Sequence, residues 1–453
     1  MTHLVSPKPP IVHEELAHIG AGLQMVDDPT GYLTRLREQY GDTFLVDVFG
    51  YQLFCTFSGK GLESLYKLEE DSASFGFATF DLLGFKTPTE IFLDTSLSIF
   101  YEMLGIRKLP YYIDVIHAVL DLELARLGDG GEVDVFDMIR TLEQRVGFGL
   151  WIGLDAAQDG TWQRLKAQFD VLSQEFAFVS PKDTLDTIVS GKARERAALQ
   201  SLYDILGDIY AARDGKSGHE KDSLTFLYEK FSEHDEVTRQ RKVAHNVINA
   251  NQGFLSNLYA AIAWVVVRLL QREDVLEKVR GEIDRTEAEF GPGFLYDMAA
   301  LNSMQYLEQV LMESVRMAQR SITLRKVLKP LEFDDGSEVY TVQPGAYITT
   351  LLSVTNMQTE ELKRFDPDHY RGNRLRDELA QSGKETVSTF GHGIHACPAQ
   401  KLSHAMCKIL VARLLRAFEL EQRFSDPRPA TSQLGGVARP ASPTRIRLQR
   451  RRV

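Results

Sequence analysis

A cysteine between a glycine-rich loop and a helix is the residue of this chain best suited to metal chemistry. The loop reads Phe390-Gly-His-Gly-Ile-His-Ala-Cys397, and apolar residues recur at helical spacing over 398–418. The thiolate is the form of cysteine that binds metals, and the free amides and dipole of a helix N-terminus favour it. Gly391 and Gly393 would let the backbone approach a flat cofactor, and Phe390 would shield the sulfur from water.

Two other interpretations of this cysteine compete with the first. A cysteine before a helix is more often a small buried apolar residue. Alternatively, Cys397, His404 and Cys407 could bind zinc, but this set lacks a fourth ligand and a familiar zinc spacing. The spacing of residues in the whole loop favours a metal other than zinc.

Phe390, Gly393 and Cys397 stand at the positions of an aromatic-x-x-Gly-x-x-x-Cys signature, in which the chain resembles the cytochrome P450 family. The resemblance implies that Cys397 ligates the iron of heme b (iron protoporphyrin IX). It also implies that His395, two residues before the cysteine, pairs with a heme propionate. Pro398 departs from the usual pattern because it has no N–H to donate to the thiolate.

A helical segment upstream, 306–316, carries a second motif. Glu313 and Arg316 are three residues apart and therefore neighbours on one helix face. Such a pair is usually solvated, but here its surroundings are apolar and resemble the Glu-x-x-Arg helix of the family, which implies a structural network. His369 stands where the family places the third member of this network, an arginine, so we expect a weaker or pH-sensitive corner. Arg325 matches the propionate-binding arginine of the family, although an isolated arginine is more often an exposed charge.

The helical stretch 236–270 contains the position at which most family members place an acid followed by threonine. Counted back from the next helix, Ser256 falls on the acid and Asn257 on the threonine. In the family the threonine holds iron-bound dioxygen and the acid helps to relay protons to it. Asn257 and the Cys397-Pro398 step resemble the prostacyclin synthase and cholesterol 7α-hydroxylase branches, of which the first needs no external oxygen and the second uses it.

Three activities are compatible with this resemblance, and the first is preferred. It is a monooxygenase that hydroxylates a lipophilic small molecule, such as a sterol, terpenoid or fatty-acid derivative, with Ser256 and Asn257 in catalytic roles. The second is an oxygen-independent isomerase or dehydratase acting on a peroxide, endoperoxide or oxime. The third is a heme-binding partner protein without turnover.

A monooxygenase of this kind would need electrons from a separate protein, because the chain has no flavin or iron–sulfur motif. An acidic ferredoxin or flavodoxin would be attracted by basic residues on both sides of the cysteine loop. These residues are Arg371, Arg374, Arg376, Lys401, Lys408, Arg413 and Arg416. Charged helix faces are, however, usually just solvated.

The elements that must position these residues are mostly helical. Apolar periodicity predicts helices over 111–128, 133–153, 161–178, 194–213, 236–270, 273–290, 304–319 and 398–418. Strand signals predict a hairpin of 43–49 and 51–57 turned at Gly50, and short strands between 322 and 351 with a turn at Gln343-Pro-Gly345.

We therefore expect a mainly α protein with small β-sheets, folded as a single cytochrome P450 domain over 1–453. Residues 440–453 are expected to form a flexible basic tail. The polar stretch 214–222 is predicted as a surface loop. The aromatic segment 75–85 would form part of a pocket roof, although aromatic runs more often serve core packing.

Composition narrows the class of protein. A net charge of −11 over 453 residues argues against a nucleic-acid partner. The 3 cysteines are too few and too scattered for a disulfide framework, which fits a reducing cytoplasm. No apolar run approaches the roughly 20 residues that span a bilayer, so we expect a soluble cytoplasmic protein without a membrane anchor.

Overall fold

The computed structural model describes residues 4–13, 19–83, 87–93, 95–173, 187, 189–213, 222–380 and 382–451. Contacts divide the chain into two compact units. Unit 1 comprises Met1–Gly84, Met312–Cys397 and Arg428–Ala441, and unit 2 comprises Phe85–Leu311, Pro398–Pro427 and Ser442–Val453. Most of the predicted loop 214–222, and residues 84 and 85 of the aromatic segment, lie outside the described residues.

Unit 1 is built around a five-stranded sheet. Its strands follow the order β2 (Thr43–Val48), β3 (Tyr51–Thr56), β9 (Tyr347–Leu351), β6 (Ile322–Val327) and β4 (Ala73–Ser74). β2 and β3 form the predicted antiparallel hairpin, with positive φ angles at Phe49 (53°) and Gly50 (84°), as a tight two-residue hairpin turn requires. β3 pairs with β9 in parallel, and β9 pairs with β6 antiparallel. Distant parts of the chain therefore meet in one sheet.

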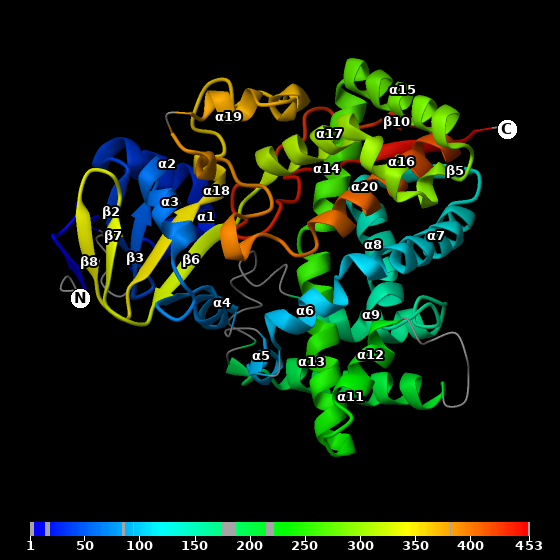
Figure 1. The fold of residues 1–453 in the computed structure, drawn as a ribbon, viewed down its shortest axis with the longest axis horizontal. Helices are drawn as coiled ribbons and strands as arrows, with labels where there is room; N and C mark the ends of the chain where they lie inside the picture. The colour runs from blue at the N-terminus through cyan, green and yellow to red at the C-terminus, as the bar shows by residue number, and fades with distance from the viewer. Residues whose placement is uncertain are drawn as a thin grey trace. The chain divides into compact units, whose positions relative to one another are not determined.

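A second sheet of unit 1 joins β1 (Val5–Ser6), β8 (Val339–Val342) and β7 (Leu331–Asp334). Its rings pack edge-on against the first sheet: the Phe54 centroid lies 5.3 Å from that of Phe333 and 5.1 Å from that of Tyr340. The predicted turn before β9 is present, with Gly345 at a φ of 95°. Helix α2 (Pro29–Tyr40) lies against β2, and α3 (Gly59–Lys67) contacts β7 and β9 (Figure 1).

Unit 2 is mostly helical, as predicted. Helix α8 (Val135–Trp151) is its centre and contacts α7 (Leu109–Arg126), α13 (Glu236–Leu255) and α14 (Leu258–Gln271). The other helices among the described residues of this unit are α5 (Glu90–Leu93), α6 (Leu97–Met103), α9 (Thr161–Leu172), α11 (Ala193–Ala211), α12 (Ser223–Lys230), α15 (Glu273–Phe290), α16 (Met298–Ser303) and α20 (Gln400–Ala417). Helix α17 (Gln305–Ala318) is divided between the units. The expected class, mainly α with small sheets, is confirmed.

The prediction of one continuous helix over 236–270 is wrong, because the structure has a break between α13 and α14. α13 and α14 follow one another nearly end to end (Figure 1), but Asn257 between them has a non-helical φ of −126° and ψ of −43°. The Asn257 side-chain amide donates a hydrogen bond to the Ser256 hydroxyl at 2.8 Å. Asparagine and serine often favour such local bonds over regular helix. A Cβ added at Gly253, one turn earlier, would meet no atom within 4 Å, so the helix borders open space there.

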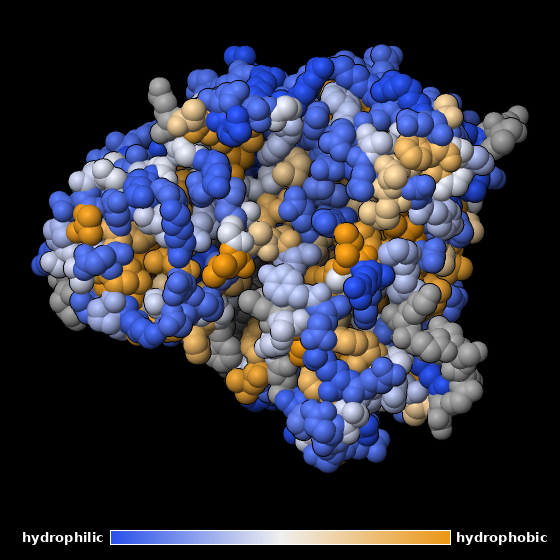
Figure 2. All heavy atoms as spheres, viewed as in Figure 1, coloured by the Kyte–Doolittle hydropathy of each residue, from blue (hydrophilic) through white to orange (hydrophobic). Residues whose placement is uncertain are grey.

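The stretch Glu236–Gln271 is also long and apolar enough to cross a membrane, but 72% of its apolar 18-residue part is buried inside the structure, as in a core helix. Figure 2 shows that the visible face of both units is mostly hydrophilic, with smaller apolar patches. Scattered patches of this kind are normal for globular proteins.

Residues 445–450 correct the prediction of a flexible tail over 440–453. They form β11 (Arg445–Arg450), the central strand of a sheet in unit 2 between β10 (Phe418–Gln422) and β5 (Gly130–Asp134). Ile446 and Leu448 are buried, while the alternate residues Arg445, Arg447 and Gln449 are exposed. The alternation of arginine with apolar residues is that of a strand with one buried face. The last strand therefore belongs to the core.

Because β11 is a central strand, Leu448→Ala should lower the free energy of unfolding by roughly 2–4 kcal/mol through the cavity it leaves. Gln449→Ala, which removes the exposed neighbour on the same strand, should change it little. Urea denaturation followed by circular dichroism measures both. Equal stability of the Leu448→Ala variant and the unmodified protein would show that this segment is a tail after all.

Candidate functional site

The loop before Cys397 lies in unit 1 and is shaped by its own hydrogen bonds. The Cys397 amide donates to the Phe390 carbonyl at 2.7 Å, and residues Gly393–His395 form a single 3-10 turn. Gly391 has a φ of 76°, and a Cβ there would lie 2.7 Å from the His395 carbonyl oxygen, so this position requires glycine. Helix α20 begins at Gln400. The structure therefore places the cysteine between a tight glycine loop and a helix N-terminus.

Arg325 lies close to a second polar side chain of unit 1, His395, which belongs to this loop. Arg325 on β6 is 1% exposed, and its Nε has no hydrogen-bond partner among the described residues; the same holds for Nε2 of His395. The Phe75 ring lies 5.3 Å from the Arg325 guanidinium carbon and 5.6 Å from the His395 ring. Burial lowers the pKa of both groups, and the Arg325 charge lowers the pKa of His395 further. Buried donors of this kind normally have an acceptor, so the pair is suited to an anion.

Glu70 also belongs to this cluster and was missed in the sequence. Its carboxylate lies 3.6 Å from Nε2 of His395. It accepts hydrogen bonds from the Ser74 hydroxyl and from the amides of Phe75 and Gly76 at the start of α4 (Phe75–Leu83). Burial opposes ionisation of Glu70, but these hydrogen bonds keep its pKa below the usual value. The one available signal was an acid shortly before a helix, which usually indicates a cap.

Glu313 and Arg316 form a fully buried ion pair. Arg316 Nε and Nη2 donate to the two carboxylate oxygens of Glu313 at 2.7 and 2.6 Å, and both side chains are 0% exposed. Arg316 Nη1 donates to the carbonyls of Asn356 and Leu362, both at 2.6 Å. Although burial opposes both charges, the mutual hydrogen bonds lower the pKa of Glu313 and raise that of Arg316. The pair therefore fixes the backbone of the segment that follows β9.

His369 occupies the third corner of this network. Its Nδ1 lies 3.1 Å from Glu313 Oε1, and its Nε2 lies 3.7 Å from Glu361 Oε1. The hydrogen bond to Glu313 raises the pKa of His369 above its usual value, although burial opposes this. His369 thus makes one hydrogen bond to Glu313, whereas an arginine at this position could donate several.

Asn356 is a second residue that sequence reasoning missed. Its side-chain amide donates to the carbonyls of Arg316 and Ser388 at 3.1 and 3.0 Å, and its Oδ1 accepts from the Ser388 amide at 2.8 Å. Asn356 therefore connects the end of α17 to the start of the cysteine loop. No sequence pattern distinguishes it from an ordinary loop asparagine.

The other predicted residues are divided between the two units. Ser256 and Asn257 belong to unit 2, whereas Cys397, Arg325 and His395 belong to unit 1. The structure does not support the zinc alternative, because His404 pairs with Glu308 at 3.2 Å and Cys407 is a fully buried residue of α20.

The predicted basic surface needs a correction at Lys408. This side chain is only 3% exposed and bonds to Glu308 at 2.6 Å and to the Leu301 carbonyl at 2.8 Å. Arg413 pairs with Asp121, and Arg416 pairs with Glu287. Among the predicted residues of α20, Lys401 is the exposed cation for which the structure gives no ion pair.

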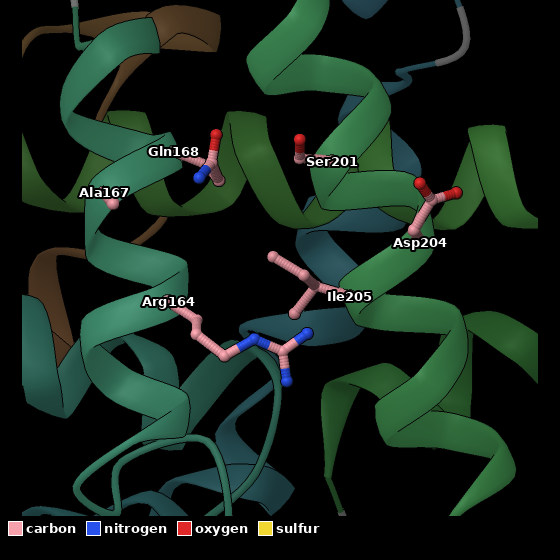
Figure 3. A pocket seen from close by; sticks show the side chains of 6 residues that line it. All are labelled: Arg164, Ala167, Gln168, Ser201, Asp204 and Ile205. Carbon is pink, nitrogen blue, oxygen red and sulfur yellow. The ribbon is translucent and has the colours of Figure 1, made fainter.

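A shallow hollow also lies on the surface of unit 2 between α9 and α11. Figure 3 shows Arg164 reaching across from α9 and Ile205 projecting from α11. The other lining residues are Ala167, Gln168, Ser201 and Asp204. This polar, open lining lacks the enclosed apolar character of a site for a lipophilic ligand.

Comparison with known proteins identifies the family to which the cysteine loop belongs. Residues 146–448 match the family model described as "Cytochrome P450". The chain belongs to the cytochrome P450 family. As a cytochrome P450, it is an oxidoreductase of the monooxygenase type, and the family implies a heme cofactor.

Relatives of known function match this P450 over nearly its full length. A sterol 14α-demethylase of Mycobacterium bovis is 22% identical over 97% of this chain and 97% of its own. Cytochrome P450 7B1 of Mus musculus is 21% identical over 91% of this chain and 85% of its own. The solved structure of retinoic acid-bound cyanobacterial CYP120A1 covers 98% of this chain and 99% of its own, with a TM-score of 0.75 and 19% identity, and shows the same fold.

The residues of unit 1 fit a heme. With a heme bound, Cys397 would supply a thiolate ligand for its iron, and Phe390 and Gly393 belong to the loop that would present this ligand. The unpartnered donors of Arg325 and His395 match the carboxylates that a heme carries on one edge. The site therefore offers one soft ligand, one cationic anchor in Arg325 and one imidazole that can donate a hydrogen bond.

The raised pKa of His369 makes the stability of this P450 depend on pH. The contribution of the imidazolium is fully present below about pH 6.5, the usual histidine pKa, and is lost as the pH rises through the higher pKa of the folded protein. A hydrogen bond between charged groups suggests a loss of roughly 1.5–3 kcal/mol. Urea denaturation at a series of pH values measures it.

His369→Arg keeps a charge beside Glu313 at every pH and should abolish this dependence. His234→Arg is the matched control, because His234 pairs with Glu233 at 3.3 Å on the surface, and it should leave the dependence intact. An unchanged pH profile in His369→Arg would contradict the assignment.

Proposed function

We propose that this P450 hydroxylates a lipophilic small molecule, using dioxygen and electrons delivered by a separate redox protein. The observation that carries the proposal is the cysteine loop of a family-matched chain beside an anion-binding pair, Arg325 and His395. When bound, a heme in its protoporphyrin IX form supplies the activation of oxygen that protein side chains alone cannot provide.

The residues of the chain would divide the remaining work. Cys397 binds the iron, and Arg325 and His395 fix the orientation of the cofactor by holding its carboxylates. Phe390 limits the access of water to the sulfur. Ser256 and Asn257, assigned by their position in the helical stretch, would hold and pass a proton through hydroxyl and amide groups or ordered water.

The proposed substrate class is a sterol, terpenoid or fatty-acid-like molecule. The relatives support it, since one of them is a sterol 14α-demethylase. The start of α4 supports it too, because Phe75 and Phe77 are both exposed apolar side chains. At 22% identity the relatives support the class of substrate rather than a particular molecule.

We also propose an acidic ferredoxin or flavodoxin as the electron donor and a cytoplasmic location without a membrane anchor. The cations available for docking are fewer than the sequence suggested. Lys401 in unit 2, and Arg371 and Arg376 in unit 1, are exposed, whereas Lys408 is committed to the interior. Exposed charges of this kind would raise the association rate at low salt.

The thiolate assignment predicts a spectrum. The reduced carbon-monoxide complex of the heme-loaded protein should show a thiolate-type absorption band, and Cys397→Ala should lose it because no other sulfur replaces the ligand. Cys407→Ala, which removes a buried thiol from the adjoining helix, should retain the band. A thiolate band in Cys397→Ala would exclude Cys397 as the ligand.

An oxygen-independent isomerase or dehydratase is the second candidate, and the break at Ser256 and Asn257 favours it. Neither residue is the acid or the threonine of the usual relay. The third candidate, a heme protein without turnover, would show no chemistry under any condition. These candidates differ in whether conversion needs both dioxygen and a reductant.

For a monooxygenase, product should form only with dioxygen and a reducing partner, and Asn257→Thr should raise the fraction of electrons recovered in product severalfold by restoring a hydroxyl. The control is Asn302→Thr, the same change at an exposed position of α16, which should not alter this fraction. The consumption of oxygen and reductant, measured together with the formation of product, gives the result. Conversion of a hydroperoxide without oxygen or reductant would establish the second candidate instead.

A further inference from the structure

One buried nitrogen in unit 1 has no hydrogen-bond partner although its ring is held firmly. His369 is 0% exposed, and Nε2 is unpartnered among the described residues. Its other nitrogen, Nδ1, faces Glu313 Oε1 at 3.1 Å. Glu313 already accepts from Arg316 and from the Asp366 amide. Because Glu313 is ionised and can only accept, Nδ1 donates the proton. In the neutral ring Nε2 then carries a lone pair.

Two carboxylates surround this lone pair. Glu361 Oε1 lies 3.7 Å from Nε2, beyond hydrogen-bonding distance. One ligand atom each from Glu361, Asp366 and His369 lies within 4.8 Å of the others. Asp366 is fixed on one side, because its Oδ1 accepts from the Asp368 amide at 3.0 Å and its own amide donates to Glu313. Its second oxygen, Oδ2, remains for an outward partner.

A surface arginine shows that this place accepts positive charge. Arg374 donates to Asp366 Oδ2 at 2.8 Å and to Glu361 Oε1 at 2.9 Å. Its side chain is 42% exposed, and those of Glu361 and Asp366 are 40% and 33% exposed. Arg374 satisfies the two carboxylates and leaves Nε2 without a hydrogen bond. An exposed arginine is the easiest of these groups to move aside.

We propose that Glu361, Asp366 and His369 form a binding site for a divalent transition metal of the Zn²⁺ class, with Arg374 as the group that the metal displaces. A histidine nitrogen with two carboxylate oxygens is a ligand set that zinc accepts, and a fourth position stays open to water. Glu313 orients the imidazole from behind, the arrangement in which a carboxylate–histidine pair serves a metal. Calcium and magnesium prefer oxygen ligands alone.

The metal would stabilise the corner where the family uses an arginine. It would connect residues 361, 366 and 369, which belong to the segment whose carbonyls bind Arg316. A bound ion would therefore raise the thermal unfolding midpoint, because it binds the folded chain and not the unfolded one.

The test uses the full-length heme-loaded protein after treatment with a chelator. Titration calorimetry with ZnCl₂, and metal analysis after desalting, should find one equivalent of zinc and a higher unfolding midpoint. Glu361→Gln and His369→Arg should each weaken binding at least tenfold. His369→Arg keeps a cation beside Glu313, so loss of zinc in that variant is not loss of fold. Arg374→Ala should strengthen binding severalfold.

Glu360→Gln is the matched control, because Glu360 is the exposed neighbour of Glu361 and pairs with Lys363. It should bind zinc like the unmodified protein. The proposal is overturned if neither the unmodified protein nor Arg374→Ala retains stoichiometric zinc. It is equally overturned if Glu361→Gln and His369→Arg bind zinc unchanged, since the ion then lies elsewhere.

Discussion

The placement of Cys397 depends on a buried guanidinium a long way back in the sequence. Arg316 is entirely removed from solvent, and a buried charge is costly unless it is paired and fully hydrogen bonded. Glu313 supplies the opposite charge, and backbone carbonyls at 356, 362 and 364 accept the remaining donors. The segment 356–364 must keep the shape that presents these carbonyls. Asn356 then transmits that shape to Ser388, at the start of the cysteine loop.

The two buried arginines of unit 1 differ in a way that separates a structural charge from a binding charge. Arg316 has carboxylate and carbonyl partners on every side. Arg325 is as well buried, but its Nε has no partner among the described residues, and its Nη1 donates to the neighbouring Leu324 carbonyl. The nearby Glu70 carboxylate raises the pKa of Arg325 and so partly offsets the lowering by burial. A cation buried with incomplete partners is suited to a ligand that brings its own negative charge.

Local patterns predicted much of this molecule. Apolar periodicity gave the main helices, and turn residues gave the β2–β3 hairpin, because both depend on neighbours in sequence. Motif spacing singled out Cys397, Glu313 and Arg316 as candidates, because a motif also consists of neighbours in sequence. β11 escaped because its pairing with residues 130–134 is long-range and its buried Ile446 and Leu448 are hidden among arginines.

The remaining differences also have physical causes. The helix break follows from a side-chain bond between Ser256 and Asn257 that competes with helix geometry. Lys408 looked like a surface cation, but the carboxylate of Glu308 holds it inside. Asn356 bonds to backbone groups of Arg316 and Ser388, and the Glu70 carboxylate lies beside His395. These partners are far away in sequence, and no residue pattern encodes such contacts.

Hydrogen bonds from the rest of the chain hold the cysteine loop in its conformation. Asn356 holds Ser388, Gln319 donates to the Thr389 carbonyl, and the Cys397 amide bonds to Phe390. The conformational entropy of this loop is therefore lost during folding of the chain rather than at the moment of ligand capture. Binding to a preorganised loop retains more of the interaction free energy as affinity. A prosthetic group would then remain in place for long periods, and the rate of its exchange would reflect opening of the surrounding chain.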